Sequence, residues 1–136
     1  METFVWPVRV YYEDTDSGGV VYYANYLKFL ERARTEWLRA RGFEQDALLR
    51  DRRLLFAVRR LEMDYHRPAR FNDRLEVISQ VARAGHASLT FAQTIQRVGS
   101  AEVLCDARVK VACIGAESFQ ACRIPRDLMK GIIGDA

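Results

Sequence analysis

Histidine and cysteine are scarce in this chain of 136 residues, and neither is spaced as a metal or redox site requires. The two histidines, His66 and His86, are far apart and have no other ligand residue at metal-binding spacing. The three cysteines, Cys105, Cys113 and Cys122, form no CxxC pair. The sequence therefore predicts no metal site and reduced, mostly buried thiols.

Long apolar runs and dense clusters of basic residues are also missing. No stretch approaches the roughly 20 apolar residues that a membrane span needs, and the acidic start at Glu2 is unlike a secretory signal. The 21 basic residues are spread among 18 acidic ones, whereas a nucleic-acid binder usually shows a denser basic patch. We therefore expect a cytoplasmic protein with no membrane span and no nucleic-acid partner.

The composition that is present is typical of a globular domain. Hydrophobic residues make up 49% and charged residues 29% of the chain, and its length suits one hydrophobic core. We therefore expect a single domain over residues 1–136.

Hydrophobic periodicity predicts one long helix among several strands. From about Tyr23 to Arg41 apolar residues recur at three- and four-residue steps, and Gly42 supplies a helix stop. A weaker helical stretch follows at 45–50. Strands are expected at 4–12 (broken at Pro7), 54–65, 75–82, 87–97 and 102–114. This order predicts an α+β fold in which an antiparallel sheet wraps around the helix, with open edges that favour self-association.

An acidic turn followed by two glycines precedes the long helix. Asp14 and Asp16 could simply shape this turn, as Asp residues often do. A calcium loop counted from Asp14 would place Asn25 where a bidentate Glu is required. A phosphatase of the haloacid dehalogenase type also carries an Asp-x-Asp pair directly after a buried strand. Here the strand before the pair contains charged residues, and the chain has no repeated βα units, so this class of enzyme is disfavoured. The turn and its carboxylates remain the best candidate for a site.

The run YYEDTDSGGVVYYANYLKFLERARTEWLRARG (residues 11–42) closely resembles the 4-hydroxybenzoyl-CoA thioesterase-like branch of the hot-dog superfamily. It is most similar to the bacterial acyl-CoA thioesterases encoded beside the Tol-Pal envelope genes, and the similarity continues through MDYHRPAR (63–70) to Arg123-Ile124-Pro125. The resemblance implies a hot-dog fold and hydrolysis of a thioester of CoA or acyl carrier protein. It also implies no cofactor, because coenzyme A is part of the substrate. The open sheet edges in turn lead us to expect a homodimer or homotetramer.

The same resemblance implies roles for individual residues. Asp16 would be the catalytic carboxylate, as nucleophile or as general base, and the Tyr23 backbone amide at the helix start would bind the thioester carbonyl. Substrate contacts would come from Tyr26, Arg83, His86 and Ser88, although Gly85-His86-Ala87 stands where the family has an Arg or Lys cluster.

Two further readings stay open at this point. A protein of the same fold could bind acyl thioesters without cleaving them, or act as an envelope-assembly partner. Glu31 lies on the predicted helix, where a carboxylate is catalytic in another branch of the superfamily, but we expect it to pair with Arg34 or Arg32.

Overall fold

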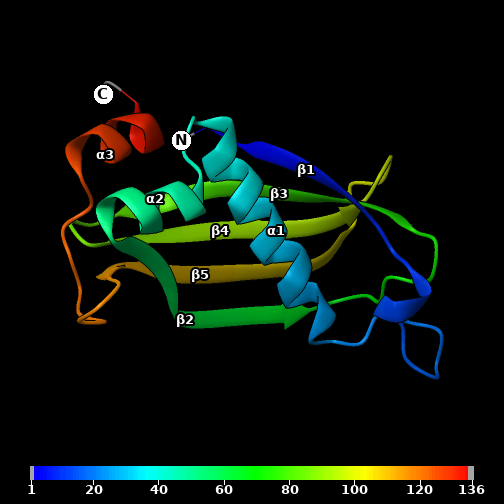
Figure 1. Cartoon of the computed structure of the whole chain (residues 1–136). Helices are drawn as coiled ribbons and strands as arrows, with labels where there is room; N and C mark the ends of the chain where they lie inside the picture. The colour runs from blue at the N-terminus through cyan, green and yellow to red at the C-terminus, as the bar shows by residue number, and fades with distance from the viewer. Residues whose placement is uncertain (1, 135–136) are drawn as a thin grey trace.

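The computed structural model describes residues 2–134. Five strands form one antiparallel sheet in the order β1-β3-β4-β5-β2, and α1 lies across one face of it (Figure 1). The elements are β1 (Phe4–Arg9), the 3-10 turn η1 (Tyr12–Asp14), α1 (Asn25–Ala40), α2 (Gln45–Arg52), β2 (Leu54–Tyr65), β3 (Arg74–Ala84), β4 (Ser88–Arg97), β5 (Val103–Gly115) and α3 (Arg126–Ile133). The predicted α+β fold, an antiparallel sheet around one long helix, is confirmed.

The helix α1 packs on the sheet through a stripe of apolar side chains. Phe29, Leu30, Ala33 and Trp37 follow each other at one-, three- and four-residue steps and are almost fully buried. The ring of Trp37 meets Phe91 of β4 edge-on at 4.9 Å. Burial of this stripe joins the helix to the middle of the sheet.

Strand β4 shows why the sheet has one apolar face. Leu89, Phe91 and Ile95 point toward α1 and are buried, while the polar residues between them lie on the opposite face. Gln93 breaks the pattern, because it is polar and yet only 1% exposed on the helix side.

One edge strand, β1, differs from what the sequence predicts, whereas the other, β2, has the predicted bounds. Pro7 does not break β1, which runs through it and, among residues 2–134, pairs with β3 alone, so the missing proline N–H can face outward at a sheet edge. At the other edge, β5 is the sole strand partner of β2 in the described part of the chain, and Val58 and Leu61 are exposed. A long edge with exposed apolar side chains is a surface suited to pairing with another strand.

The sequence reasoning missed the C-terminal helix α3. Its amphipathic signal is short, with Leu128 and Ile132 four residues apart after Pro125, and both leucine and isoleucine are buried. Among residues 2–134, no helix is long and apolar enough to cross a membrane.

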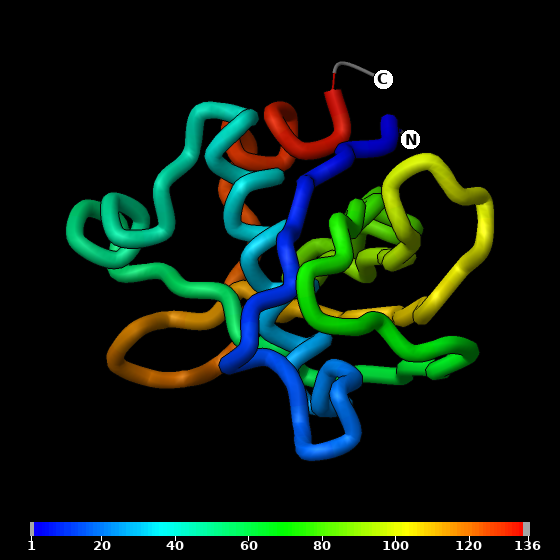
Figure 2. Tube along the Cα trace, turned by 90° about the vertical axis from the view of Figure 1, so that its right-hand side faces the viewer, coloured from blue at the N-terminus to red at the C-terminus, as the bar shows by residue number. Residues whose placement is uncertain are grey.

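The loops and short helices gather at the two opposite ends of the sheet (Figure 1). The loop that follows β1 lies at the right of Figure 1, and α2, α3 and the turn between β3 and β4 lie at the left. In the side view the same loop protrudes from the body of the molecule, below α1 (Figure 2). The acidic turn is therefore presented at one end of the molecule.

Candidate active site

The acidic turn is a small hairpin built on Asp16. The Asp16 amide donates to the carbonyl of Val20 at 2.9 Å, and the Gly19 amide donates to the carbonyl of Asp16 at 3.0 Å. Gly19 has φ of +77°, a conformation that glycine adopts without the steric cost that other residues meet. An antiparallel bridge between Thr15 and Val21 closes the base of the hairpin.

The carboxylate of Asp16 is exposed, and one of its oxygens is held. The Gly18 amide donates to Oδ1 at 2.8 Å, and a Cβ added at Gly18 would lie 3.2 Å from the same oxygen. Oδ2 makes no hydrogen bond to residues 2–134. A carboxylate fixed through one oxygen can therefore present the other to a substrate or to water.

Asp14 has a different role from Asp16. Its side chain is buried, and Oδ2 accepts a hydrogen bond from the Tyr11 amide at 2.8 Å. Its carbonyl oxygen accepts two more, from the Tyr22 amide at 2.9 Å and from Nδ2 of Asn25 at 2.8 Å. Asp14 therefore holds the loop together, which is the turn-shaping role that the sequence left open for both acids.

Tyr23 lies in the turn immediately before α1 and not in the helix itself. The helix begins at Asn25, with Ala24 as N-cap, and no side chain caps it. The Tyr23 amide has no acceptor among residues 2–134, so its N–H is available beside the positive end of the helix dipole. The predicted start of the helix, at about Tyr23, thus lies two residues before the observed start at Asn25.

Tyrosine side chains form the wall next to this amide. The hydroxyl of Tyr65, at the end of β2, donates to the carbonyl of Tyr23 at 3.2 Å, and the two rings meet edge-on. Tyr26 is buried, and its hydroxyl oxygen accepts a hydrogen bond from the Ala69 amide at 2.9 Å. Burial raises the pKa of Tyr26 above its ordinary value. Its ring contacts Tyr65 and its hydroxyl supports the chain at Ala69.

The other expected substrate contacts lie at the opposite end of the sheet. Arg83 is near the end of β3, His86 is exposed in the turn to β4, and Ser88 begins β4. The hairpin of Asp16 is instead tied to the segment before β3, where Val20 bridges Arg70. At roughly 3.3 Å per residue, the stretch of β3 from Arg74 to Arg83 places the two groups about 30 Å apart within one chain.

Further basic residues that the sequence reasoning did not select lie beside His86. The Ile124 amide donates to the carbonyl of His86 at 2.8 Å, which brings Arg123 and Arg126 to this end of the molecule. Neither arginine forms an ion pair within the described part of the chain. No sequence spacing signals this arrangement, because it depends on how the segment after β5 folds back.

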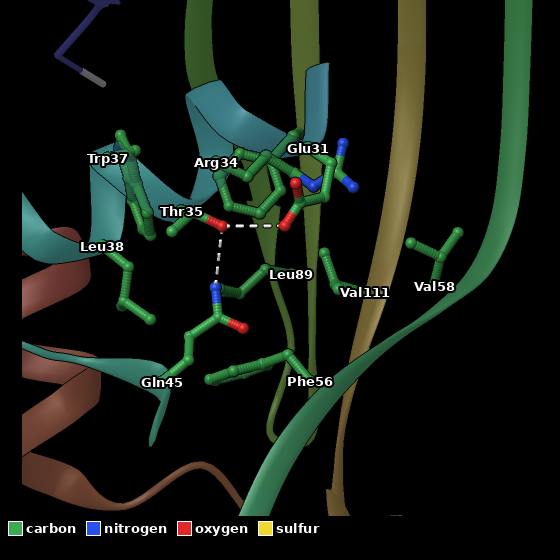
Figure 3. A pocket seen from close by; sticks show the side chains of 11 residues that line it. Glu31, Arg34, Thr35, Trp37, Leu38, Gln45, Phe56, Val58, Leu89 and Val111 are labelled. Carbon is green, nitrogen blue, oxygen red and sulfur yellow. Dashed lines mark hydrogen bonds between the residues drawn. The ribbon is translucent and has the colours of Figure 1, made fainter. Parts of the chain in front are cut away.

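A pocket of about 120 Å³ lies between α1, α2 and the sheet (Figure 3). Its apolar walls include Leu38, Phe56 and Phe91, and its remaining lining consists of Glu31, Arg34, Thr35, Trp37, Gln45, Val58, Leu89 and Val111. Gln45 Nε2 donates to Thr35 Oγ1 at 3.1 Å, and this hydroxyl donates to Glu31 Oε1 at 2.9 Å. None of the residues chosen from the sequence as substrate contacts lines this pocket.

Arg34 and Glu31 do not form the expected ion pair. Nη1 of Arg34 donates to Oε1 of Gln93 at 3.0 Å, and the hydrogen bond of Glu31 goes to Thr35. Burial lowers the pKa of Arg34, and the nearby charge of Glu31 acts in the opposite direction. Within residues 2–134, no three or more His, Cys, Asp or Glu residues are placed to hold a metal ion.

Comparison with known proteins identifies the family. Residues 18–104 match the thioesterase superfamily. The chain belongs to this superfamily. It is 44% identical over 132 residues to the acyl-CoA thioester hydrolase YbgC of Escherichia coli O6:H1, covering 97% of this chain and 94% of that protein. It is also 44% identical over 125 residues to the acyl-CoA thioesterase YbgC of Haemophilus influenzae, covering 92% and 90% of the two chains.

Solved thioesterase structures share the fold of this thioesterase. A probable thioesterase from Bartonella henselae is 35% identical, with a TM-score of 0.86 over 91% of this chain and 100% of that one. A 4-hydroxybenzoyl-CoA thioesterase variant bound to 4-hydroxybenzoyl-CoA is only 16% identical, yet it superposes with a TM-score of 0.90 over 96% and 98% of the two chains. The resemblance that the sequence suggested, to hot-dog thioesterases, is confirmed.

Proposed function

We propose that this thioesterase hydrolyses acyl-CoA thioesters, with Asp16 as the catalytic carboxylate and the Tyr23 amide as the oxyanion donor. The observation that carries the proposal is the contrast between two acids: Asp14 is buried in the loop, while Asp16 is exposed with one free oxygen. The names of the two YbgC relatives at 44% identity support the same substrate class.

The chemistry of a thioester fits this small set of groups. The leaving thiolate has a conjugate-acid pKa near that of cysteine, about 8.5, so it needs little protonation as it departs. The reaction requires a nucleophile or an activated water and a donor for the negative charge that develops on the carbonyl oxygen. Asp16 either attacks the carbonyl to form an anhydride or deprotonates water, and the Tyr23 amide stabilises the oxyanion.

Substitution of Asp16 by Asn tests this assignment. Asn keeps the size of the side chain and an oxygen for the Gly18 amide but removes the charge, so kcat should fall roughly a hundredfold to ten-thousandfold. Release of free thiol from a panel of acyl-CoA substrates measures the rate. Asp51→Asn, at an exposed carboxylate on α2, is the matched control and should keep parent activity.

The outcomes of this experiment separate the alternatives. A folded Asp16→Asn protein with near-parent turnover contradicts the site. A parent protein that binds acyl-CoA without any turnover supports a non-catalytic acyl-thioester-binding or envelope-assembly role. Asp14→Asn should lower kcat less than Asp16→Asn, because the Asp14 carboxylate contacts the loop backbone.

We also propose a homodimer in which two β2 strands pair antiparallel and share the site. Arg60 and Glu62 flank the exposed Leu61, so pairing centred on Leu61 sets each arginine opposite the glutamate of the other copy. This pairing brings the Tyr65 end of one β2 beside the Leu54 end of the other. The hairpin of Asp16 in one copy then faces the end of the other copy that carries the pocket and the basic residues.

In the shared site, the acyl group and the CoA phosphates of the substrate would bind to different parts of the other copy. The acyl group would enter the apolar pocket at Phe56 and Val58 of the other copy, and the phosphates of CoA would meet Arg83, His86 and Arg123. Guanidinium groups suit phosphate oxygens because they donate in a forked geometry. Acyl carrier protein is the second carrier we propose, and comparing rates on the two carriers with the same acyl group distinguishes them.

The cellular setting is proposed on the resemblance alone. We propose a cytoplasmic enzyme that works alongside the Tol-Pal envelope system and assembles as a homotetramer of two such dimers. Light scattering of the purified protein measures the assembly: a mass of four chains supports the tetramer, and a mass of two chains supports the dimer alone.

A further inference from the structure

A single carbonyl group connects the two halves of the proposed site. The carbonyl oxygen of Asp14 accepts hydrogen bonds from the Tyr22 amide at 2.9 Å and from Asn25 Nδ2 at 2.8 Å. The segment between these two donors contains Tyr23, whose free amide is the proposed oxyanion donor. The short turn that carries this amide is therefore fastened at both of its ends to the same atom.

The same carbonyl belongs to the hairpin that carries the proposed catalytic carboxylate. Asp16 follows Asp14 by two residues and is locked in its hairpin by the bonds to Val20 and Gly19. Asp14 itself is held by the Tyr11 amide. The position of Asp16 relative to the Tyr23 amide thus depends on how the Asp14 carbonyl is bound.

Asn25 supplies the part of this connection that comes from α1. Within residues 2–134, its side chain makes the only side-chain hydrogen bond from α1 to the loop 14–20. The Tyr22 bond, by contrast, lies within the hairpin itself, since it continues the pairing of Thr15 with Val21. Without the Asn25 side-chain bond, the hairpin keeps its own shape but is held to the helix start only through the backbone, where the Asn25 amide donates to the Tyr22 carbonyl at 2.8 Å.

We propose that Asn25 is a positioning residue of the thioesterase reaction, which sets the distance and angle between the Asp16 carboxylate and the Tyr23 amide. This role rests on the proposed function. Catalysis depends steeply on such geometry, because a displacement of about 1 Å can lower a rate by roughly a hundredfold. The Asn25 side chain touches neither the thioester nor the attacking group.

The substitution Asn25→Asp tests the proposal with almost no change of size. It replaces the donor Nδ2 by an oxygen, which repels the carbonyl of Asp14 at hydrogen-bond distance and pushes the hairpin away from α1. A carboxylate in the first turn of a helix is favourable toward the helix dipole, so the fold should persist. We expect kcat to fall roughly 10- to 100-fold while KM stays within about threefold of the parent.

A second variant and a matched control guard against a purely structural effect. Asn25→Ala removes the bond without adding repulsion, so its loss in kcat should be smaller than that of Asn25→Asp. Asn72→Asp makes the same chemical change at an exposed asparagine whose Oδ1 accepts from Arg9, and it should leave kcat and KM unchanged. Circular dichroism and melting temperature report whether each variant folds.

A double variant distinguishes positioning from general loosening. Because Asn25 acts through the geometry between Asp16 and Tyr23, Asn25→Asp should lower the residual activity of Asp16→Asn by a much smaller factor than it lowers parent activity. Full additivity, or parent-like kcat in folded Asn25→Asp and Asn25→Ala, overturns the positioning role. If Asn25→Asp fails to fold, the kcat of Asn25→Ala decides alone. Parent-like activity of Asp16→Asn would instead contradict the proposed function.

Discussion

At the scale of single residues, burial separates side chains that look alike in the sequence. Asp14 and Asp16 are two positions apart in one acidic run, and spacing alone gives both the same turn-forming role. The structure buries Asp14 against the Tyr11 amide and leaves Asp16 exposed. The catalytic role of Asp16 stays a prediction from the resemblance, and the difference in burial depends on contacts around Asp14 that no spacing rule contains.

The cysteines allow a prediction at the same scale. Burial raises the pKa of the Cys105 thiol to about 12 and raises that of Cys113, whereas Cys122 is only partly buried. At pH 8 about one Cys105 thiol in ten thousand is ionised, and the thiolate is the reactive form. A thiol-reactive dye should therefore label Cys122 fast and the other two slowly until urea unfolds the protein.

The raised pKa of Cys105 also makes the stability of the folded protein depend on pH in a defined direction. The raised pKa keeps Cys105 neutral in the folded protein, so the stability linked to this thiol is lost only as the pH rises from about 9 toward about 12. Cys122→Ser should abolish the fast phase. Fast labelling of two or three thiols in the native protein at pH 8 would contradict the burial of Cys105 and Cys113.

At the scale of elements, periodicity located α1 and the five strands but missed features that depend on neighbours. Pro7 looks like a strand breaker until β1 is known to be an edge, and α3 is too short for its pattern to stand out. The polar Gln93 on the buried face of β4 is another such case. Its Nε2 donates to the Leu30 carbonyl at 3.1 Å and to Ser79 Oγ at 2.9 Å, which turns Oε1 toward Arg34.

This buried link between α1 and β4 predicts a measurable loss of stability. Gln93→Leu leaves the side chains of Arg34 and Ser79 without this partner, so the free energy of unfolding should fall by about 2–3 kcal/mol. Urea unfolding measures the change. Gln96→Leu, on the opposite face of the same strand, is the control and should stay within about 0.5 kcal/mol of the parent.

A double variant tests the physical reason for that loss. Replacing both groups, as Arg34→Met with Gln93→Leu, removes the stranded cation along with its partner, and part of the stability should return. A Gln93→Leu protein as stable as the parent would show that water satisfies Arg34 and that the link contributes little.

At the scale of the whole molecule, the separation between Asp16 and the basic end of the sheet is the main constraint on function. The sequence places Arg83 and His86 after a strand, but only the register shows that this strand leads away from the acidic hairpin. One chain therefore does not bring all the expected substrate contacts to one place. The proposed pairing of two β2 strands would bring them together.

The dimer can be tested through Leu61 at the centre of the exposed edge. Leu61→Arg places two like charges face to face at the proposed two-fold axis, so light scattering should show a monomer and turnover should fall at least about tenfold. Val5→Arg makes a similar change at the other edge of the sheet, where Val5 is also exposed, and should change neither mass nor activity. A fully active Leu61→Arg dimer would contradict the β2 pairing.

The sheet order also imposes a sequence of events on biosynthesis. Strand β2 leaves the ribosome early, but within residues 2–134 its only strand partner is β5, the last strand to be made. At roughly 5–20 residues per second, translation separates the two by about 3–10 s. During that interval Leu54, Leu55, Phe56 and Val58 are exposed on an unpaired strand, which is the kind of segment that aggregates or recruits chaperones. The edge that we assign to partner recognition in the finished protein is thus also the segment that most needs protection while the chain is growing.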